Sequence, residues 1–341
     1  MSQSSSAVIS PWAAPAGDRG RARPQPLPTL ASSSRGPRDS GPPTRPTTPR
    51  PLSPASADRP VRGRLELGIK VRDGRSIAST QFHEGALRVL RPHYLDDSGQ
   101  VCYVVVNPGG AYLGADLFVL DVEVEAGADL LLTTQSATKV YRTPGSYAEQ
   151  RMTVRLGEGA RLELVPDQLI AYREASYRQN TQITVRPSSS LVMAEVVTPG
   201  WSPDGASFKY EELRLRNEIR VAAPEGSPDN AELLALDNLL IRPPAGDVSG
   251  MGFMEGFSHL GSLVVVDARV DQPLADELHG LTAGHDAYTG ISLTRTVAGT
   301  TGLVLRSLSD GTAKLNSLLG ACTALLRERW HGQAPLNLRK Y

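Results

Sequence analysis

Six carboxylates lie in or beside stretches of alternating polar and apolar residues, where they could act as acids, bases or cation ligands. They are Asp116, Asp121, Glu149, Asp167, Glu174 and Glu195. No two of them have a spacing that forces an acid and a base together, as general acid–base catalysis requires. The sequence therefore predicts no catalytic pair, and the chain is not expected to be an enzyme.

Motifs for nucleotides and tightly bound metals are also missing from the sequence. There is no GxxxxGK[ST] string, so no P-loop is predicted. None of the six histidines has a second histidine four residues away, the spacing that lets one helix face grip a metal. Cys102 and Cys322 are far apart and form no CxxC motif, which favours an intracellular, reducing compartment over a disulfide framework.

The elements that must position these side chains are mostly strands. Polar and apolar residues alternate strictly over residues 120–124 and 152–156, a pattern of period two that indicates β-structure with one buried face. A strand–turn–strand pattern recurs along the chain. It begins at Val122, at Val154 (32 residues later) and at Ile183 (29 residues later). Either stacked repeating units or an ordinary antiparallel meander would explain it, and both give an all-β core.

One long helix is expected at the C-terminus, over about residues 310–331. Apolar side chains between Leu315 and Trp330 follow helical spacing and form a single stripe. A short helix is also expected between Asp271 and Gly290, with Pro273 in its first turn.

Composition divides the chain at residue 60. Residues 1–60 hold 13 of the 26 prolines, with eight Arg against three Asp, or 8 − 3 = +5. Such a segment cannot bury enough apolar surface to fold, so we expect a disordered extension; an Arg- and Ser-rich transit peptide is the alternative. The remainder, 61–341, is one predicted domain with 28 basic and 33 acidic residues (−5). That charge argues against nucleic-acid binding, and no apolar run is long enough for a membrane span.

Four short segments, in order, resemble the UreD (also called UreH) family of urease accessory proteins. The most specific is TTQSATKVYR at 133–142, similar to the family signature TTQxATKVYR. NPGGAYLGAD at 107–116 resembles a glycine turn of the family, although Ala115 stands where the family usually has Gly. LVPDQLI at 164–170 and LNLRKY at 336–341 resemble its later elements.

One family segment is altered here. The family often carries GRxxxGExF, whereas residues 200–208 read GWSPDGASF, without the Arg and the Glu. Any role of those two charges cannot be transferred to this chain.

The resemblance implies a fold, a function and partners. It implies stacked, β-helix-like sheets with about two helices, and a cytoplasmic, non-enzymatic scaffold for nickel insertion into apo-urease. It implies binding to the accessory protein UreF and, through UreF, to the GTPase UreG. No stably bound cofactor is expected, and nickel would be handled only transiently.

Candidate functional residues follow from this reading. A transient nickel path is expected to use scattered carboxylates rather than tight His or Cys sites, and its candidates are Asp116, Glu149, Asp167 and Glu195. Candidate partner contacts are Lys139, Tyr141, Arg142, Arg339 and Tyr341. Two other functions stay open: a stand-alone metal carrier, and a carbohydrate-active enzyme with a β-helix fold.

Overall fold

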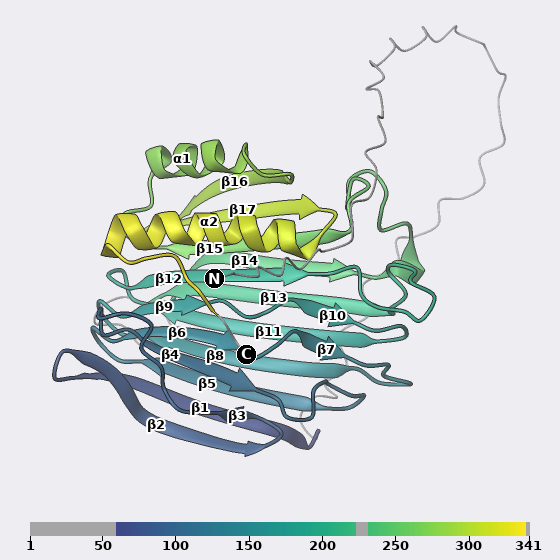
Figure 1. The fold of residues 1–341 in the computed structure, drawn as a ribbon, viewed down its shortest axis with the longest axis horizontal. Coiled ribbons are helices and arrows are strands. Elements are labelled where there is room, and N and C mark those ends of the chain that lie inside the picture. Colours follow the sequence, from purple (N-terminus) through teal and green to yellow (C-terminus); the bar gives the residue numbers. More distant parts are fainter. Residues whose placement is uncertain (1–58, 223–230, 339–341) are drawn as a thin grey trace, which may run out of the picture. The chain divides into compact units, whose positions relative to one another are not determined.

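Two large β-sheets make up most of the protein (Figure 1). The computed structural model describes residues 59–222 and 231–338, all within one compact unit. The seven-stranded sheet has the order β14 (Glu232–Ile241), β13 (Glu212–Val221), β11 (Ser176–Val185), β8 (Ala148–Leu156), β5 (Leu117–Val124), β1 (Val61–Arg72), β2 (Arg75–Gly85).

The second sheet has ten strands. Eight follow the order β16 (Tyr288–Arg295), β17 (Thr301–Ser309), β15 (His259–Val266), β12 (Ser190–Val197), β9 (Arg161–Leu164), β6 (Asp129–Thr134), β4 (Val101–Val106), β3 (Arg88–Val89). Two short strands, β7 (Thr138–Val140) and β10 (Leu169–Ala171), join it to the side. The remaining elements are a 3-10 turn (η2, Pro243–Ala245) and the helices α1 (Gln272–Thr282) and α2 (Thr312–His331).

The sequence repeat corresponds to the stacking of strands. Val122 of β5 lies beside Val154 of β8, which lies beside Ile183 of β11, and every one of these pairings is parallel. In the second sheet Leu130, Leu162 and Leu191 stack in the same way. The chain therefore winds as a β-helix, as predicted, and the meander alternative is wrong. Parallel stacking places equivalent apolar side chains in continuous buried rows, which a single hairpin could not achieve.

Antiparallel strands close both ends of this parallel stack. At one end β2 pairs with β1 and β3 pairs with β4. At the other end β14 pairs with β13, and β15, β17 and β16 extend the second sheet. The parallel centre thus has no exposed edge of its own.

Helix α2 covers the face of β12, β15 and β17 that points away from the sheet-to-sheet core, and α1 packs against β16 and α2 (Figure 1). Leu315, Leu318, Cys322 and Leu326 of α2 are all less than 2% exposed, so the predicted stripe faces inward. Asp271 caps α1, because its carboxylate accepts a hydrogen bond from the Leu274 amide, and Pro273 lies in the first turn.

Candidate functional site

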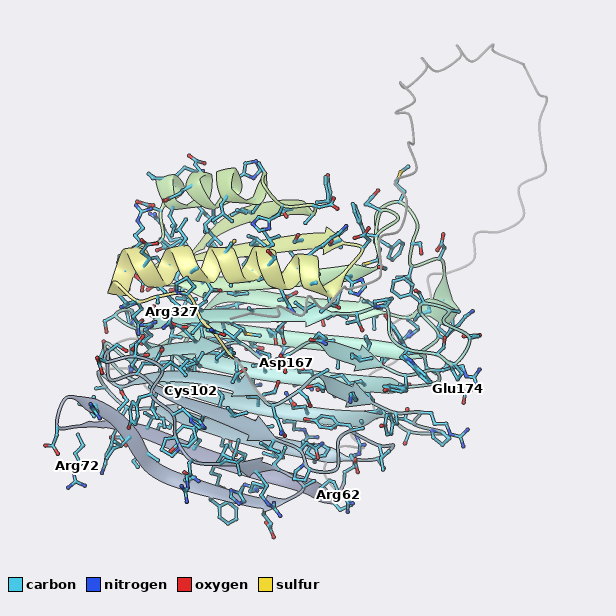
Figure 2. All side chains as sticks on the ribbon, viewed as in Figure 1. Arg62, Arg72, Cys102, Asp167, Glu174 and Arg327 are labelled. Atoms are coloured by element: carbon cyan, nitrogen blue, oxygen red, sulfur yellow. The ribbon has the colours of Figure 1, made fainter. Side chains whose placement is uncertain are left out.

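A cavity of about 80 Å³, with a mostly apolar surface and several polar side chains in its lining, lies between the two sheets, inside the β-helix. Two of the four predicted path carboxylates, Asp167 and Glu195, line it. Asp167 also lines an outer groove of about 480 Å³ next to α2, and it lies below that helix in Figure 2. One carboxylate therefore borders both the interior cavity and the groove outside it.

Glu195 is the deepest charged group at the cavity. It lies on β12, and its two carboxylate oxygens accept hydrogen bonds from the side-chain amides of Gln179 and Asn217, both at 2.6 Å. Burial raises the pKa of Glu195, and these two hydrogen bonds oppose the rise only in part. No ion pair to Glu195 is found among the described residues. A buried carboxylate held by neutral amides gains stability from a proton or from a passing cation.

Two oxygen atoms near Glu195 are free to bind a further ligand. The Thr181 hydroxyl and the Asn217 side-chain oxygen are buried, and neither forms a hydrogen bond within the described part of the chain. Tyr112 donates a 2.7 Å hydrogen bond to Gln150, another lining residue. Carboxylate, amide and hydroxyl oxygens together can bind a divalent cation weakly.

The other two predicted path residues lie elsewhere. The Glu149 carboxylate is paired with Arg151 at 2.7 Å and with Arg59 at 3.2 Å. Asp116 accepts a 2.8 Å hydrogen bond from the Leu113 amide and closes a turn. Neither lines the cavity, so the structure brings together only Asp167 and Glu195 of the four, and the nickel path itself stays a prediction. The sequence could not show this, because facing direction depends on strand register.

Arg59 shows where the folded domain begins. Its guanidinium lies 4.3 Å from the centre of the Tyr147 ring and bonds the Tyr147 carbonyl as well as Glu149. Arg59, which the sequence analysis placed in the extension 1–60, therefore contacts the described domain, and the division of the chain at residue 60 stays a prediction. The predicted disorder of residues 1–58 lies outside the described residues.

A first prediction separates the extension from its anchor. Deleting residues 1–58 should leave the free energy of unfolding unchanged, and likewise urease activation, the activity that the UreD resemblance implies. In the full chain, Arg59→Ala should lower the free energy of unfolding by about 1–2 kcal/mol, because it removes a partner from the buried Glu149. Urea titrations and urease activation in cells measure both effects. Loss of activation by a folded deletion variant would show that the extension is a targeting or docking arm.

The signature segment crosses from the core to the surface. Thr133 and Thr134 end β6, Lys139 lies in β7, and Tyr141 follows it with 41% of its surface exposed. The Tyr141 ring meets the Tyr172 ring edge-on at 4.7 Å, and Tyr172 meets Trp201 at 4.9 Å. Successive turns of the β-helix thus contribute to one aromatic row (Tyr141, Tyr172, Trp201) on its surface.

The two cations of the signature form no ion pair among the described residues. Neither Lys139 nor Arg142 forms an ion pair with Glu149 or Asp167 in the described structure. Arg142 is exposed next to the aromatic row. The other two predicted partner contacts, Arg339 and Tyr341, lie outside the described residues.

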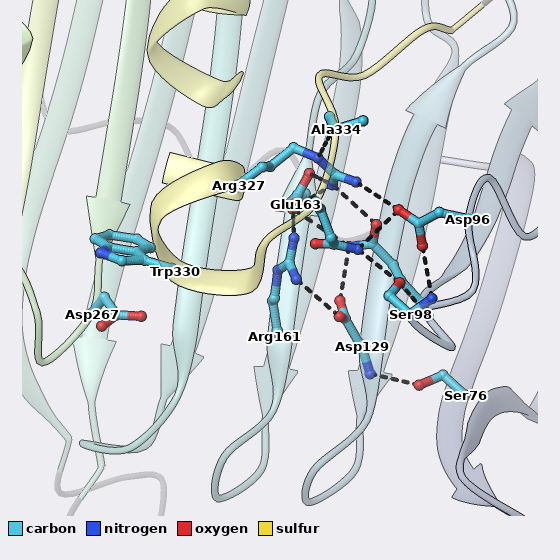
Figure 3. A network of polar contacts seen from close by, with 12 residues as sticks. Ser76, Asp96, Ser98, Asp129, Arg161, Glu163, Asp267, Arg327, Trp330 and Ala334 are labelled. Carbon is cyan, nitrogen blue, oxygen red and sulfur yellow. Dashed lines mark hydrogen bonds and ion pairs between the residues drawn. The ribbon is translucent and has the colours of Figure 1, made fainter. Parts of the chain in front are cut away.

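A buried charge network was not predicted from the sequence (Figure 3). Arg327 of α2 is 3% exposed, and one of its terminal nitrogens donates to both carboxylate oxygens of Glu163, at 2.7 and 2.6 Å. Glu163 also pairs with Arg161, which reaches Asp129 at 3.2 Å. Burial raises the pKa of Asp129 to about 6, against the opposing effect of Arg161. In the sequence, Arg327 lies near the C-terminal end of the helix, where a cation interacts favourably with the helix dipole. Nothing in that position predicts a buried carboxylate as its partner.

The same network holds the segment after α2. The Arg327 Nε donates to the Ala334 carbonyl at 3.0 Å, and the Gln333 side chain donates to Ser98 at 2.7 Å and to Asp96 at 3.2 Å. The end of the helix is therefore fastened to the loop before β4.

No group of three or more His, Cys, Asp and Glu side chains could hold a metal ion within the described ranges. The cavity accordingly offers two carboxylates and neutral oxygens rather than a closed coordination shell.

Comparison with known families decides the assignment. The family model described as UreD urease accessory protein matches residues 61–340. The chain belongs to this family. Its segments at 107–116, 133–142 and 164–170 lie within the matched range, and membership makes the chain an accessory protein rather than an enzyme.

Similar proteins carry the same description over nearly their whole length. "Urease accessory protein UreD" of Arthrobacter sp. (strain FB24) is 80% identical over 279 residues, covering 82% of this chain and 94% of that protein. The protein of that name from Corynebacterium glutamicum (strain ATCC 13032) is 45% identical, covering 82% and 96%. The one from Staphylococcus aureus (strain bovine RF122) is 33% identical, covering 82% and 98%.

No helix in the described part of the chain is both long enough and apolar enough to cross a membrane.

Proposed function

We propose that this UreD family member is a cytoplasmic scaffold through which nickel passes on its way to apo-urease. Nickel is the cargo of this process and not a resident cofactor. The observation that supports the proposal is the interior cavity, where Glu195 forms no direct ion pair with any described residue and Asp167 also borders the outer groove.

Weak binding suits this role. A divalent ion at a site with one or two carboxylates and neutral oxygens exchanges readily, whereas a closed shell of imidazoles and thiolates would retain it. The amides of Gln179 and Asn217 hold the Glu195 carboxylate in place without neutralising it. The buried charge can therefore attract a cation and still release it.

The scaffold role requires partners, and we propose UreF as the direct partner, with UreG bound through UreF and apo-urease as the recipient. Tyr141, Tyr172 and Trp201 form an exposed aromatic row flanked by Arg142. Aromatic and Arg side chains contribute much of the binding energy at protein interfaces. We also propose that Arg339 and Tyr341 contribute to partner binding.

Charge reversal tests the partner surface. The double variant Lys139→Glu/Arg142→Glu should reduce urease activation by about tenfold, because it opposes a contact worth roughly 1.4 kcal/mol. Thermal unfolding should stay unchanged, since Arg142 is exposed and Lys139 is half-buried without an ion pair. Reversal of the exposed Arg72 is the matched control. Full activation by the double variant would remove the signature cations from the functional surface.

The stand-alone metal carrier is the second candidate function, and equilibrium dialysis separates it from a scaffold. The purified chain alone should bind nickel weakly, with a dissociation constant of about 10⁻⁵ M or higher, because no closed donor set is present. Binding should tighten when UreF is added. Tight nickel binding by the chain alone would favour the carrier. The other alternative from the sequence, a carbohydrate-active enzyme, is excluded because the chain belongs to the UreD family.

A further inference from the structure

The seven-stranded sheet ends at β14, and no described strand pairs with the outer edge of β14, although the Thr294 hydroxyl of β16 donates a hydrogen bond to the Leu234 carbonyl. Leu233, Leu236 and Leu240 form a row along β14 and are 44%, 50% and 48% exposed. Sheet edges of this length usually carry charges, prolines or bulges that prevent pairing with another chain. The β13–β14 pair has one register shift, at Ile219/Arg220, so residues 236–241 keep regular pairing.

The opposite sheet continues past this edge. In the register of β16 and β17, Gly290 pairs with Arg306 and Tyr288 pairs with Leu308. The Arg306 side chain bonds Asp237 of β14, so this face of β16 points toward the seven-stranded sheet. Tyr288 is nevertheless 67% exposed. In Figure 1, β16 lies beyond β17, at the end of the stack where β14 is the last strand of the other sheet.

An apolar pocket of about 440 Å³ adjoins the end of β14. Its walls come from the end of β14 and from the segment 242–254, with the lining side chains Leu240, Ile241, Val248, Phe253, Met254 and Leu260. Phe253 is 70% exposed. A pocket of this kind accepts one large apolar side chain from a partner.

Charge around the leucine row is positive. On the same outer face, Arg214, Arg216, Arg220 and Arg242 stand against Glu212 and Glu218, or 4 − 2 = +2. The surface therefore favours a segment with acidic residues.

We propose that β14 binds an extended, acidic and apolar segment of another protein, which adds as a strand to the sheet edge. One apolar side chain of the segment fills the pocket, and its inward-facing side chains cover Tyr288. Main-chain hydrogen bonds provide affinity in this mode, and alternate side chains provide specificity. The inference rests on the proposed scaffold function, in which the segment belongs to a partner in urease maturation.

Two other occupants fit less well. The chain's own residues 1–60 carry +5 and would be repelled by the arginines. A second copy pairing β14 with β14 would require a two-fold axis perpendicular to the sheet. That axis would bring both overhanging β16 strands to the same side and into the same space.

Amide hydrogen exchange tests strand addition directly. The full-length chain is mixed separately with purified UreF and with purified apo-urease. Binding of one of them should slow the exchange of the β14 amides in residues 236–241, which a contact through side chains alone would not do. The double variant Leu236→Glu/Leu240→Glu should weaken that binding by at least about tenfold. The matched control, Leu90→Glu/Leu95→Glu, alters leucines that are 59% and 47% exposed and should leave affinity unchanged.

Three results would overturn the inference. Complex formation without slower exchange in β14 would show that the partner does not add as a strand. Unchanged affinity of the Leu236/Leu240 variant would show that the partner does not bind this surface. Protection that rises with the concentration of the chain alone would show that a second copy occupies the β14 edge. Urease activation by the wild-type chain is recorded in parallel. Activation without protection of β14 refutes only this inference, whereas no activation refutes the proposed function itself.

Discussion

Replacing Arg327 with methionine should lower the free energy of unfolding by about 3–5 kcal/mol, the usual cost of removing one partner from a buried ion pair. Glu163 is only 1% exposed and would keep Arg161 as its remaining cation. Methionine retains much of the apolar volume of the arginine side chain, so the loss reports on charge and hydrogen bonding. Urea denaturation followed by circular dichroism measures the change.

The control is a surface ion pair of the same helix. Arg329 pairs with Glu277, and both side chains are nearly half exposed, so Arg329→Met should cost less than about 1 kcal/mol. A second variant, Arg327→Met/Glu163→Leu, should recover part of the lost stability, because it removes the buried carboxylate that has lost one of its two cations. Equal costs at Arg327 and Arg329 would contradict the assigned importance of the network.

The same variant has a functional consequence for the segment after α2. Arg327 holds the Ala334 carbonyl, and Leu336 and Leu338 line the groove that Asp167 borders. Arg327 therefore positions one wall of the outer groove that Asp167 borders. It acts as a positioning residue and not as a ligand of nickel.

Glu195→Gln should reduce urease activation at least about tenfold, the largest functional effect expected of any single substitution in this chain. The substitution keeps the size of the side chain and removes its charge, so the cavity loses the group that attracts a cation. One hydrogen bond from Gln179 or Asn217 must rearrange, because the new amide offers a donor as well as an acceptor. Nickel content of urease matured with wild-type or variant chain measures the effect.

The pH dependence supplies a second readout for Glu195. Burial raises its pKa, so the carboxylate takes up a proton as pH falls through that raised value, and the proton competes with nickel. Nickel transfer by the wild-type chain should therefore decline toward acidic pH, and transfer by Glu195→Gln should lack this component. The folded state favours the protonated form, so wild-type stability should rise relative to the variant over the same fall in pH.

A matched control guards against a general defect. Glu211 is exposed and lies outside the cavity, so Glu211→Gln should activate urease normally. Normal activation and an unchanged pH profile in a folded Glu195→Gln variant would remove Glu195 from the path.

The sequence by itself determined the strands, the C-terminal helix and the repeat. Alternation in 120–124 and 152–156 predicted β5 and β8, because local side-chain period reports directly on which residues face a core. The recurrence at Val122, Val154 and Ile183 was visible as well, although it did not distinguish a parallel stack from a meander. Hydrogen bonding between residues 32 and 29 positions apart decided that question.

Only the tertiary structure decided which polar residues meet. Asp116, Glu149, Asp167 and Glu195 look alike in the sequence, but register turns Glu195 toward the interior and leaves Glu149 paired with Arg59 and Arg151. Arg327 became a buried partner of Glu163 because the packing of α2 on β12, β15 and β17 brings its C-terminal end within hydrogen-bond distance of β9, at a separation of 164 residues. Short-range patterns fix the periodicity of a strand or helix, whereas the partner of a charged side chain depends on packing between segments distant in the chain.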